Sequence, residues 1–209
     1  FDYFRGQRRN LPPRPTIQRA DTDKAQSRDR LERLAAWLAT VPELESLHGS
    51  HDGILAVAQH YGIPTPFLDV TTSPKVAAFF AMYSEEVPEK KLQTEAFIYC
   101  FNSIDLEEQW RSINESYRSD HGYELVRLIT PTIPNLWRLT AQHGSFIDMR
   151  VDPTAFIALT PYATIKFRPG QLDPLLKQSI YPTRKSHIEQ LLEQFFLIES
   201  YPERWSDLG

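Results

Sequence analysis

The chain has 209 residues, of which 23 are basic and 27 acidic, so its formal net charge is −4. The single cysteine, Cys100, excludes an intramolecular disulfide and any cysteine-cluster metal site. With 41% hydrophobic residues the chain is too apolar to be disordered. Its longest apolar run, residues 76–83, is far shorter than the ~20 residues that span a bilayer. We therefore expect a soluble, cytoplasmic protein that makes no use of a membrane. Because the sequence begins at Phe1, without a methionine, we also expect residues upstream of it.

Proline outnumbers glycine in this chain, with 16 prolines against 8 glycines. Average usage is about 7% glycine and 5% proline, so the usual order is reversed. The glycines are scattered, and neither a Walker loop nor a dinucleotide-type GxGxxG motif occurs in the sequence. A nucleotide would therefore have to be held by side chains, because no glycine-rich loop is present to hold it.

The first half of the chain predicts two strands and three helices. Residues 1–5 have strand composition and lead into a proline-rich loop. Residues 21–40 carry apolar side chains at helical spacing. The next predicted helix begins at Asp52 as its N-cap and ends at Gly62. Residues 67–71 predict a short strand, and Ser73 followed by Pro74 predicts the start of a buried helix.

The second half predicts strands and helices in an irregular order. Strands are expected over residues 95–101, 125–129, 145–149, 156–159 and 164–167, with a weaker candidate over 177–181. Helices are expected over 105–118 and 135–142, and from Thr183 or Ser186 through Phe195. Because no regular strand–helix–strand repeat is present, we expect an α+β fold in a single domain.

Two kinds of enzyme site receive little support from the sequence. Of the histidines only His48 and His51 are close together, and no second pair of metal ligands follows them. We interpret both as solvated loop residues and expect no metal. A serine hydrolase is set aside because the sequence contains no GxSxG motif.

Three polar clusters, far apart in the sequence, each adjoin an apolar element. Their candidate ligand-binding residues are Arg5, Gly6 and Gln7 in the first, Asp69, Thr71, Thr72 and Ser73 in the second, and Arg138, Gln142 and His143 in the third. A glycine lets a ligand approach the backbone, and the free N–H groups at a helix start suit an anion or an amide. Each cluster also has a purely structural interpretation: Arg5 pairs with Asp2 or Asp69, Ser73 only caps its helix, and Gln142 satisfies a buried backbone group.

Several of these segments resemble the FRG domain family. The resemblance rests on Phe4-Arg5-Gly6-Gln7, on Pro15-Thr16-Ile17-Gln18-Arg19 and, most specifically, on residues 59–81. It continues through Arg138, Ala141-Gln142-His143-Gly144-Ser145-Phe146, Ile180-Tyr181-Pro182, Lys185, Ile188 and Asp207-Leu208-Gly209. Because it extends over nearly the whole chain, it implies one FRG-type domain over residues 1–209.

FRG domains in turn resemble, more distantly, the ADP-ribosyltransferase fold. That resemblance implies a mixed, split β-sandwich with flanking helices around an extended cleft for NAD. It implies that Arg5 binds the NAD phosphates or the adenosine ribose, that Thr72 and Ser73 line the nicotinamide-ribose side, and that Gln142 takes the third catalytic position. Arg5, Ser73 and Gln142 would then transfer ADP-ribose from the co-substrate NAD to a protein or nucleic acid. Family context further implies a toxin or phage-defence effector with an antitoxin or regulatory partner.

The sequence departs from these patterns at two positions. Pro66 stands where members of the family often carry an arginine, and Gln142 stands where transferases often carry a glutamate. An amide can hold a ribose hydroxyl but cannot deprotonate an acceptor. Either another carboxylate, Asp69 or Glu124, activates the acceptor, or the acceptor needs little activation, or the domain only binds.

Two further functions remain open at the level of sequence. The domain could be a non-catalytic module that binds a nucleotide or a nucleic-acid end, or a pure interaction domain without nucleotide binding. A basic N-terminal stretch could contact phosphates locally, although a solvated loop explains it equally well; it comprises Arg5, Arg8, Arg9, Arg14 and Arg19.

Overall fold

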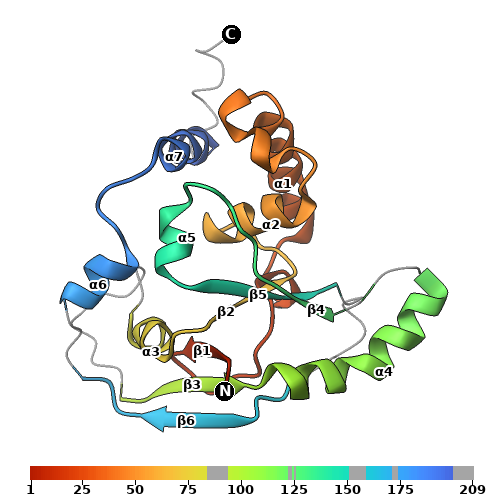
Figure 1. Ribbon diagram of the computed structural model, residues 1–209, viewed down its shortest axis with the longest axis vertical. Helices are drawn as coiled ribbons and strands as arrows, with labels where there is room; N and C mark the ends of the chain where they lie inside the picture. Colours follow the sequence, from red (N-terminus) through yellow and green to blue (C-terminus); the bar gives the residue numbers. More distant parts are fainter. Residues whose placement is uncertain (84–93, 122–123, 125, 151–158, 171–173, 200–209) are drawn as a thin grey trace.

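Six β-strands form one sheet in the part of the chain that the structure describes. The computed structural model describes residues 1–83, 94–121, 124, 126–150, 159–170 and 174–199. The strands are β1 (Tyr3–Gln7), β2 (Phe67–Thr71), β3 (Ala96–Phe101), β4 (Val126–Ile129), β5 (Gly144–Met149) and β6 (Ala163–Phe167). Their order across the sheet is β4-β5-β2-β1-β3-β6, and each neighbouring pair is antiparallel (Figure 1). The predicted single α+β domain is confirmed.

Helices connect these strands without a regular repeat. The α-helices are α1 (Lys24–Leu38), α2 (His51–His60), α3 (Pro74–Met82), α4 (Ser103–His121), α5 (Trp137–Ala141), α6 (Pro174–Ile180) and α7 (His187–Glu199). Two 3₁₀ helices, η1 (Thr16–Gln18) and η2 (Pro42–Leu47), were not among the expected elements. Their short length leaves too little apolar periodicity to detect.

Three predictions about individual elements need correction or fall outside the described residues. The N-cap of α2 is Ser50, whose Oγ accepts a hydrogen bond from the N–H of Gly53, and Asp52 lies inside the first turn. The weak strand candidate over 177–181 falls within and just after α6, because Leu176 and Ile180 are four residues apart and pack together against α3. The strand predicted over 156–159 lies almost entirely in the segment 151–158, outside the described residues.

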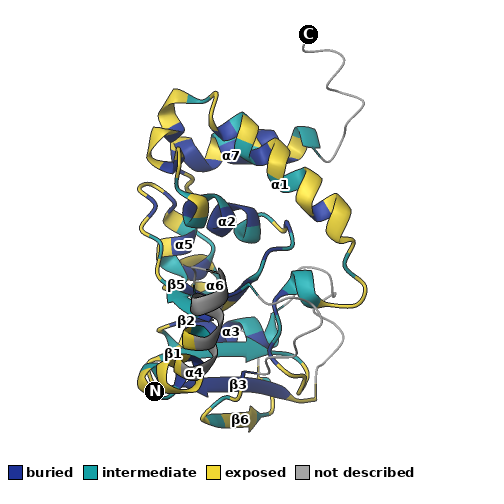
Figure 2. Ribbon diagram, turned by 90° about the vertical axis from the view of Figure 1, so that its right-hand side faces the viewer, coloured by how far each residue is buried: buried dark blue, intermediate teal, exposed yellow. Residues whose placement is uncertain are grey.

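The predicted split β-sandwich is wrong for the described strands, which form one continuous sheet and not two packed sheets. The physical reason lies in β1, which pairs with β2 on one side and with β3 on the other and so joins the two halves. Of these strands β3 is buried throughout, whereas β6 is largely exposed at the edge (Figure 2).

Two groups of helices cover one face of the sheet side by side. Phe67 of β2 and Phe146 of β5 pack in one core with α1, α2, α5 and α7, whereas Phe4 of β1 packs with Ala77 of α3 in another. Because Phe4 lies directly opposite Thr71, and Thr71 shares a face with Phe67, both helix groups lie on the same face. In Figure 1, α1, α2, α5 and α7 lie above β2 and β5, and α3 lies beside β1. The opposite face carries a third core, which includes Leu68, Val70, Tyr99, Phe101, Leu106, Trp110 and Ile147.

Strand pairing between β1 and β2 is limited to one register pair, Phe4 with Thr71, and we call the boundary between these two strands the seam. Only Phe4 and Thr71 are paired across the seam, whereas β1 has five register pairs with β3 and β2 has five with β5. Beyond Phe4 the two strands therefore diverge. The seam opens on the face of the sheet where the two helix groups meet.

Gly6 allows α3 to pack directly on β1. A Cβ atom at this position would lie 1.8 Å from the carbonyl oxygen of Ala77 and 2.6 Å from the backbone nitrogen of Ala81. Both are backbone atoms, so no side-chain movement could relieve the clash. The glycine is thus required by a helix that crosses the strand, whereas the sequence suggested close approach of a ligand.

Candidate functional site

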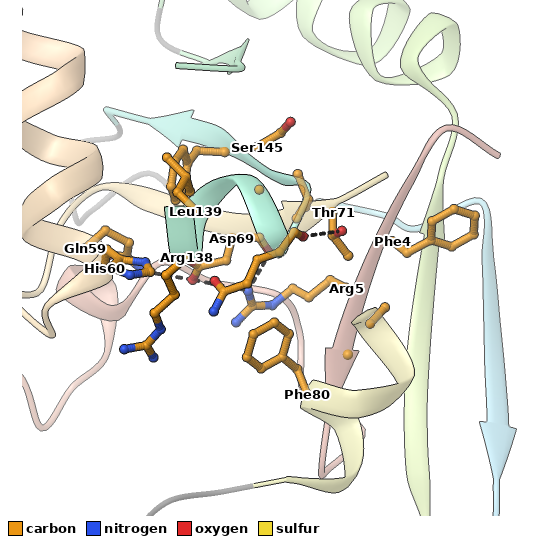
Figure 3. Close-up of a pocket in the computed structure, with 16 residues that line it drawn as sticks. Phe4, Arg5, Gln59, His60, Asp69, Thr71, Phe80, Arg138, Leu139 and Ser145 are labelled. Carbon is orange, nitrogen blue, oxygen red and sulfur yellow. Dashed lines mark hydrogen bonds and ion pairs between the residues drawn. The ribbon is translucent and has the colours of Figure 1, made fainter. Parts of the chain in front are cut away.

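A pocket of about 320 Å³ opens at the seam (Figure 3). Its walls are formed by residues of β1, β2 and β5, by the C-terminal end of α2, by α3, and by α5 with the turn that leads into β5. The lining residues are Phe4, Arg5, Gly6, Gln59, His60, Asp69, Val70, Thr71, Ala77, Phe80, Arg138, Leu139, Gln142, Gly144, Ser145 and Phe146. Its volume is at the lower end of the range of 300–1,000 Å³ typical of small-molecule sites.

Arg5 enters the opening between the two diverging strands. Its Nη1 donates a hydrogen bond of 2.6 Å to the main-chain oxygen of Asp69, and its Nε donates one of 3.1 Å to Oε1 of Gln7. The carboxylate of Asp69 lies 3.6 Å from the same Nη1. Burial lowers the pKa of the Arg5 guanidinium, the Asp69 carboxylate opposes this effect, and the positive charge of Arg19 adds to it. Arg5 therefore replaces part of the missing ladder between β1 and β2 with a side-chain contact.

A second guanidinium, that of Arg138, comes from α5. Its Cζ lies 4.3 Å above the ring centroid of Tyr181, and its backbone N–H donates to Oε1 of the buried Glu189. Figure 3 shows Arg5, Arg138, His60 and the ring of Phe80 around the same opening. Burial lowers the pKa of His60 to about 3, and the charge of Arg138 adds to this effect. His60 is therefore neutral, and the positive charges of the pocket wall belong to the two arginines.

The carboxylate in the pocket wall is that of Asp69. In β2 this residue is exposed and its four neighbours in the strand are buried. Nε2 of Gln59 donates a hydrogen bond of 2.8 Å to Oδ2 of Asp69. Oε1 of Gln59 in turn accepts from the hydroxyl of the buried Thr65 at 2.7 Å.

The third cluster is joined to the second through main-chain oxygens. Oγ1 of Thr71 donates to the carbonyl of Gln142 at 2.8 Å, and the N–H of Thr72 donates to the carbonyl of His143 at 3.3 Å. His143 has a φ of 47°, in the left-handed region, and forms the turn between α5 and β5. These contacts explain how residues 71 positions apart come to lie in one site.

The structure thus brings together most of the predicted site residues. Six of them line the pocket: Arg5, Gly6, Asp69, Thr71, Arg138 and Gln142. Four predicted residues are not among the lining residues: Gln7, Thr72, Ser73 and His143. Ser73 caps α3, since its Oγ accepts from the N–H of Val76, and its own N–H donates to Oγ1 of Thr71. Ser73 thus makes the helix-capping contact of its structural interpretation and does not line the pocket with Arg5.

The lining residues that the sequence interpretation did not assign to a site include Gln59, His60 and Phe80. All three lie in residues 59–81, the stretch with the most specific motif, so a signal was present. The sequence of that stretch does not show which of its side chains face the seam.

The described residues contain neither a candidate metal site nor a candidate membrane span. No group of three or more His, Cys, Asp or Glu side chains in that part of the chain could hold a metal ion. None of the helices seen in the described ranges is long and apolar enough to cross a membrane.

The chemistry of the pocket suits a ligand that carries both negative charge and hydrogen-bond donors. Two guanidinium groups favour phosphate oxygens. A carboxylate accepts hydrogen bonds but cannot donate them, and Gln142 offers both kinds of group.

Comparisons with known proteins bear on the N-terminal part of the chain. No curated protein and no solved structure matches the sequence. The distant resemblance to ADP-ribosyltransferases therefore stays a prediction. The model of the FRG domain matches residues 2–90, which include β1, α1, α2, β2 and α3, so this part of the chain is similar to FRG domains.

Proposed function

We propose that the chain binds NAD in the seam pocket and transfers its ADP-ribosyl group to a macromolecular acceptor. The observation that carries the proposal is the convergence of Arg5, Asp69, and the pair Arg138 and Gln142, from three separate segments, on one pocket. Two arginines can hold a diphosphate in a fixed position, and Phe80 offers an aromatic face beside them.

The reaction requires few groups from the protein. The bond between the nicotinamide nitrogen and C1′ of the ribose breaks, its electron pair stays with nicotinamide, and C1′ acquires oxocarbenium character. An acceptor nucleophile forms the new bond to C1′ and releases one proton. The protein must fix the diphosphate and the ribose so that this displacement is aligned.

Asp69 is the residue that we assign to take the acceptor proton. Of the two carboxylates considered from the sequence, Asp69 lines the pocket and Glu124 does not. Gln142 would hold a ribose hydroxyl, because an amide can bind but cannot deprotonate. This assignment resolves the departure at Gln142 without requiring a glutamate there.

The test uses NAD labelled in its adenine moiety, with whole-cell protein and RNA offered as acceptors. Label transfer and nicotinamide release are measured for the wild-type chain and for Arg138→Leu. We expect Arg138→Leu to lower NAD affinity about ten-fold or more, because it removes a charge-assisted contact to phosphate.

Arg184→Leu is the matched control for this experiment. Arg184 also lies over an aromatic ring, at 5.8 Å from the centroid of Trp137, but it does not line the pocket. We expect NAD affinity to be unchanged in it. A folded wild-type chain that neither transfers label nor releases nicotinamide would refute the transferase, and NAD binding without turnover would identify a binding module.

The wider role follows from family context and stays a prediction. It comprises the toxin or phage-defence function, an antitoxin or regulatory partner, and the cytoplasmic location.

A further inference from the structure

A chain of hydrogen bonds connects the backbone of β2 to the pocket. The N–H of Phe67 donates to Oγ1 of Thr65 at 3.1 Å, and the Thr65 hydroxyl donates to Oε1 of Gln59 at 2.7 Å. Nε2 of Gln59 then donates to Oδ2 of Asp69 at 2.8 Å. We call Thr65 and Gln59 the relay. Gln59 and Thr65, together with Phe67 and Asp69, lie within residues 59–81, the stretch with the most specific motif. The transfer reaction described above assigns no role to Gln59 or Thr65.

The relay has one favourable direction. A backbone N–H can only donate, so Thr65 accepts from Phe67 and directs its own hydrogen toward Gln59. If the Gln59 amide were turned over, its oxygen would face a carboxylate oxygen of Asp69. In the observed orientation Nε2 of Gln59 donates and Oδ2 of Asp69 accepts.

The relay engages one carboxylate oxygen of Asp69, Oδ2, and not the other, Oδ1. In the part of the chain that the structure describes, Oδ1 of Asp69 accepts no hydrogen bond, and the side chain is 54% exposed. Thr65, by contrast, is 1% exposed. A buried hydroxyl and a partly buried amide thus hold a half-exposed carboxylate beside Arg5.

We infer that Asp69 recognises a hydroxyl group of the ligand's ribose, and that Gln59 and Thr65 are positioning residues for it. This inference rests on the proposed nucleotide-binding function. A carboxylate that is fixed next to an arginine accepts from a hydroxyl and repels a phosphate. The pocket therefore prefers a phosphorylated ribose over phosphate groups alone.

The experiment compares ADP-ribose with inorganic pyrophosphate by calorimetric titration of the full chain. Pyrophosphate carries the negative charge without the hydroxyl groups. We expect the wild-type chain to bind ADP-ribose more tightly. We expect Asp69→Ala to lower ADP-ribose affinity about ten-fold or more and to leave pyrophosphate affinity unchanged or higher.

Variants of the relay separate positioning from folding. Thr65→Val and Gln59→Met should lower ADP-ribose affinity less than Asp69→Ala does, with no loss of pyrophosphate affinity. Thr65→Ser retains the hydroxyl and should restore wild-type affinity. Asp69→Asn, which keeps the size of the side chain, carries the test if Asp69→Ala has a lowered melting temperature.

The outcomes distinguish the two proposals. A folded wild-type chain that binds neither ligand overturns the nucleotide site and this inference with it. A chain that binds ADP-ribose but in which the Asp69 variants weaken both ligands equally, or neither, overturns the role of Asp69 alone. Equal affinity of the relay variants and the wild type would overturn positioning by Gln59 and Thr65.

Discussion

His60, at the C-terminal end of α2, is a partly buried histidine in the wall of the pocket. Burial lowers its pKa from the ordinary value near 6.5 to about 3, and the charge of Arg138 adds to this effect. Between these two values the unfolded chain binds a proton that the folded chain does not. Acidification through this range therefore favours the unfolded chain, and the contribution of His60 to stability is fully present only above pH 6.5.

We expect His60→Gln to reduce the loss of stability on acidification. Between about pH 7 and pH 5, its free energy of unfolding should fall about 2 kcal/mol less than that of the wild type, because each pKa unit corresponds to about 1.4 kcal/mol. Urea unfolding at both pH values measures the difference. His51→Gln, at an exposed position, is the control variant. Equal pH sensitivity of His60→Gln and the wild type would contradict the prediction.

At the scale of elements, one carboxylate joins α5 to α7. Oε2 of the buried Glu189 accepts from the N–H of Ser186 at 2.9 Å, and Oγ of Ser186 accepts from the N–H of Glu189 at 3.1 Å. This reciprocal pair is a capping box at the start of α7. Oε1 of Glu189 also accepts from the N–H of Arg138, in the first turn of α5. The helix that carries Arg138 is therefore fixed by a residue about fifty positions later in the chain.

Replacing Glu189 with Ala should lower the free energy of unfolding by about 2–3 kcal/mol, because it removes a cap and leaves a buried N–H unsatisfied. NAD or ADP-ribose affinity should fall as well, since Arg138 loses its support. Chemical denaturation measures the first effect and titration the second. Glu193→Ala removes an ion pair with Lys185 between two half-exposed side chains and should cost less than about 1 kcal/mol.

For the whole molecule, the seam is the feature that decides where a site can form. The carbonyl of Asp69 is directed at Arg5, on the β1 side, so the N–H of Asp69 is directed to that side as well. Leu68 and Val70 direct their backbone groups toward β5 instead. In the middle of β2, the edge that faces β5 is therefore paired, whereas the edge that faces β1 is open.

Amide hydrogen exchange followed by NMR should report this asymmetry. We expect the N–H of Asp69 to exchange at least about ten-fold faster than those of Leu68 and Val70, since it has no ladder partner in β1. Added ADP-ribose should slow exchange at Asp69. Uniform protection along β2 would show that the seam is closed in solution.

Much of the secondary structure could be predicted from local pattern. The strand over 67–71 and the start of α3 at Ser73-Pro74 are confirmed, because a buried apolar run and a serine–proline cap are both local signals. Gly62 at the end of α2 is confirmed by its φ of 84°. The helix α6 was missed. Its apolar residues pack against α3, which lies about a hundred residues earlier in the chain.

The candidate site could be predicted in part. The sequence by itself indicated Arg5, Asp69, Arg138 and Gln142 as members of polar clusters beside apolar elements, because residue type and the order of residues are local properties. It also determined that no glycine-rich loop would hold a nucleotide.

Only the tertiary structure decided which of these side chains share a pocket. Divergence of two strands after one register pair, the crossing of α3 over Gly6 and the support of α5 by Glu189 all depend on contacts between residues far apart in the chain. Local sequence cannot encode such choices, because each depends on the position of a partner that the local segment does not contain.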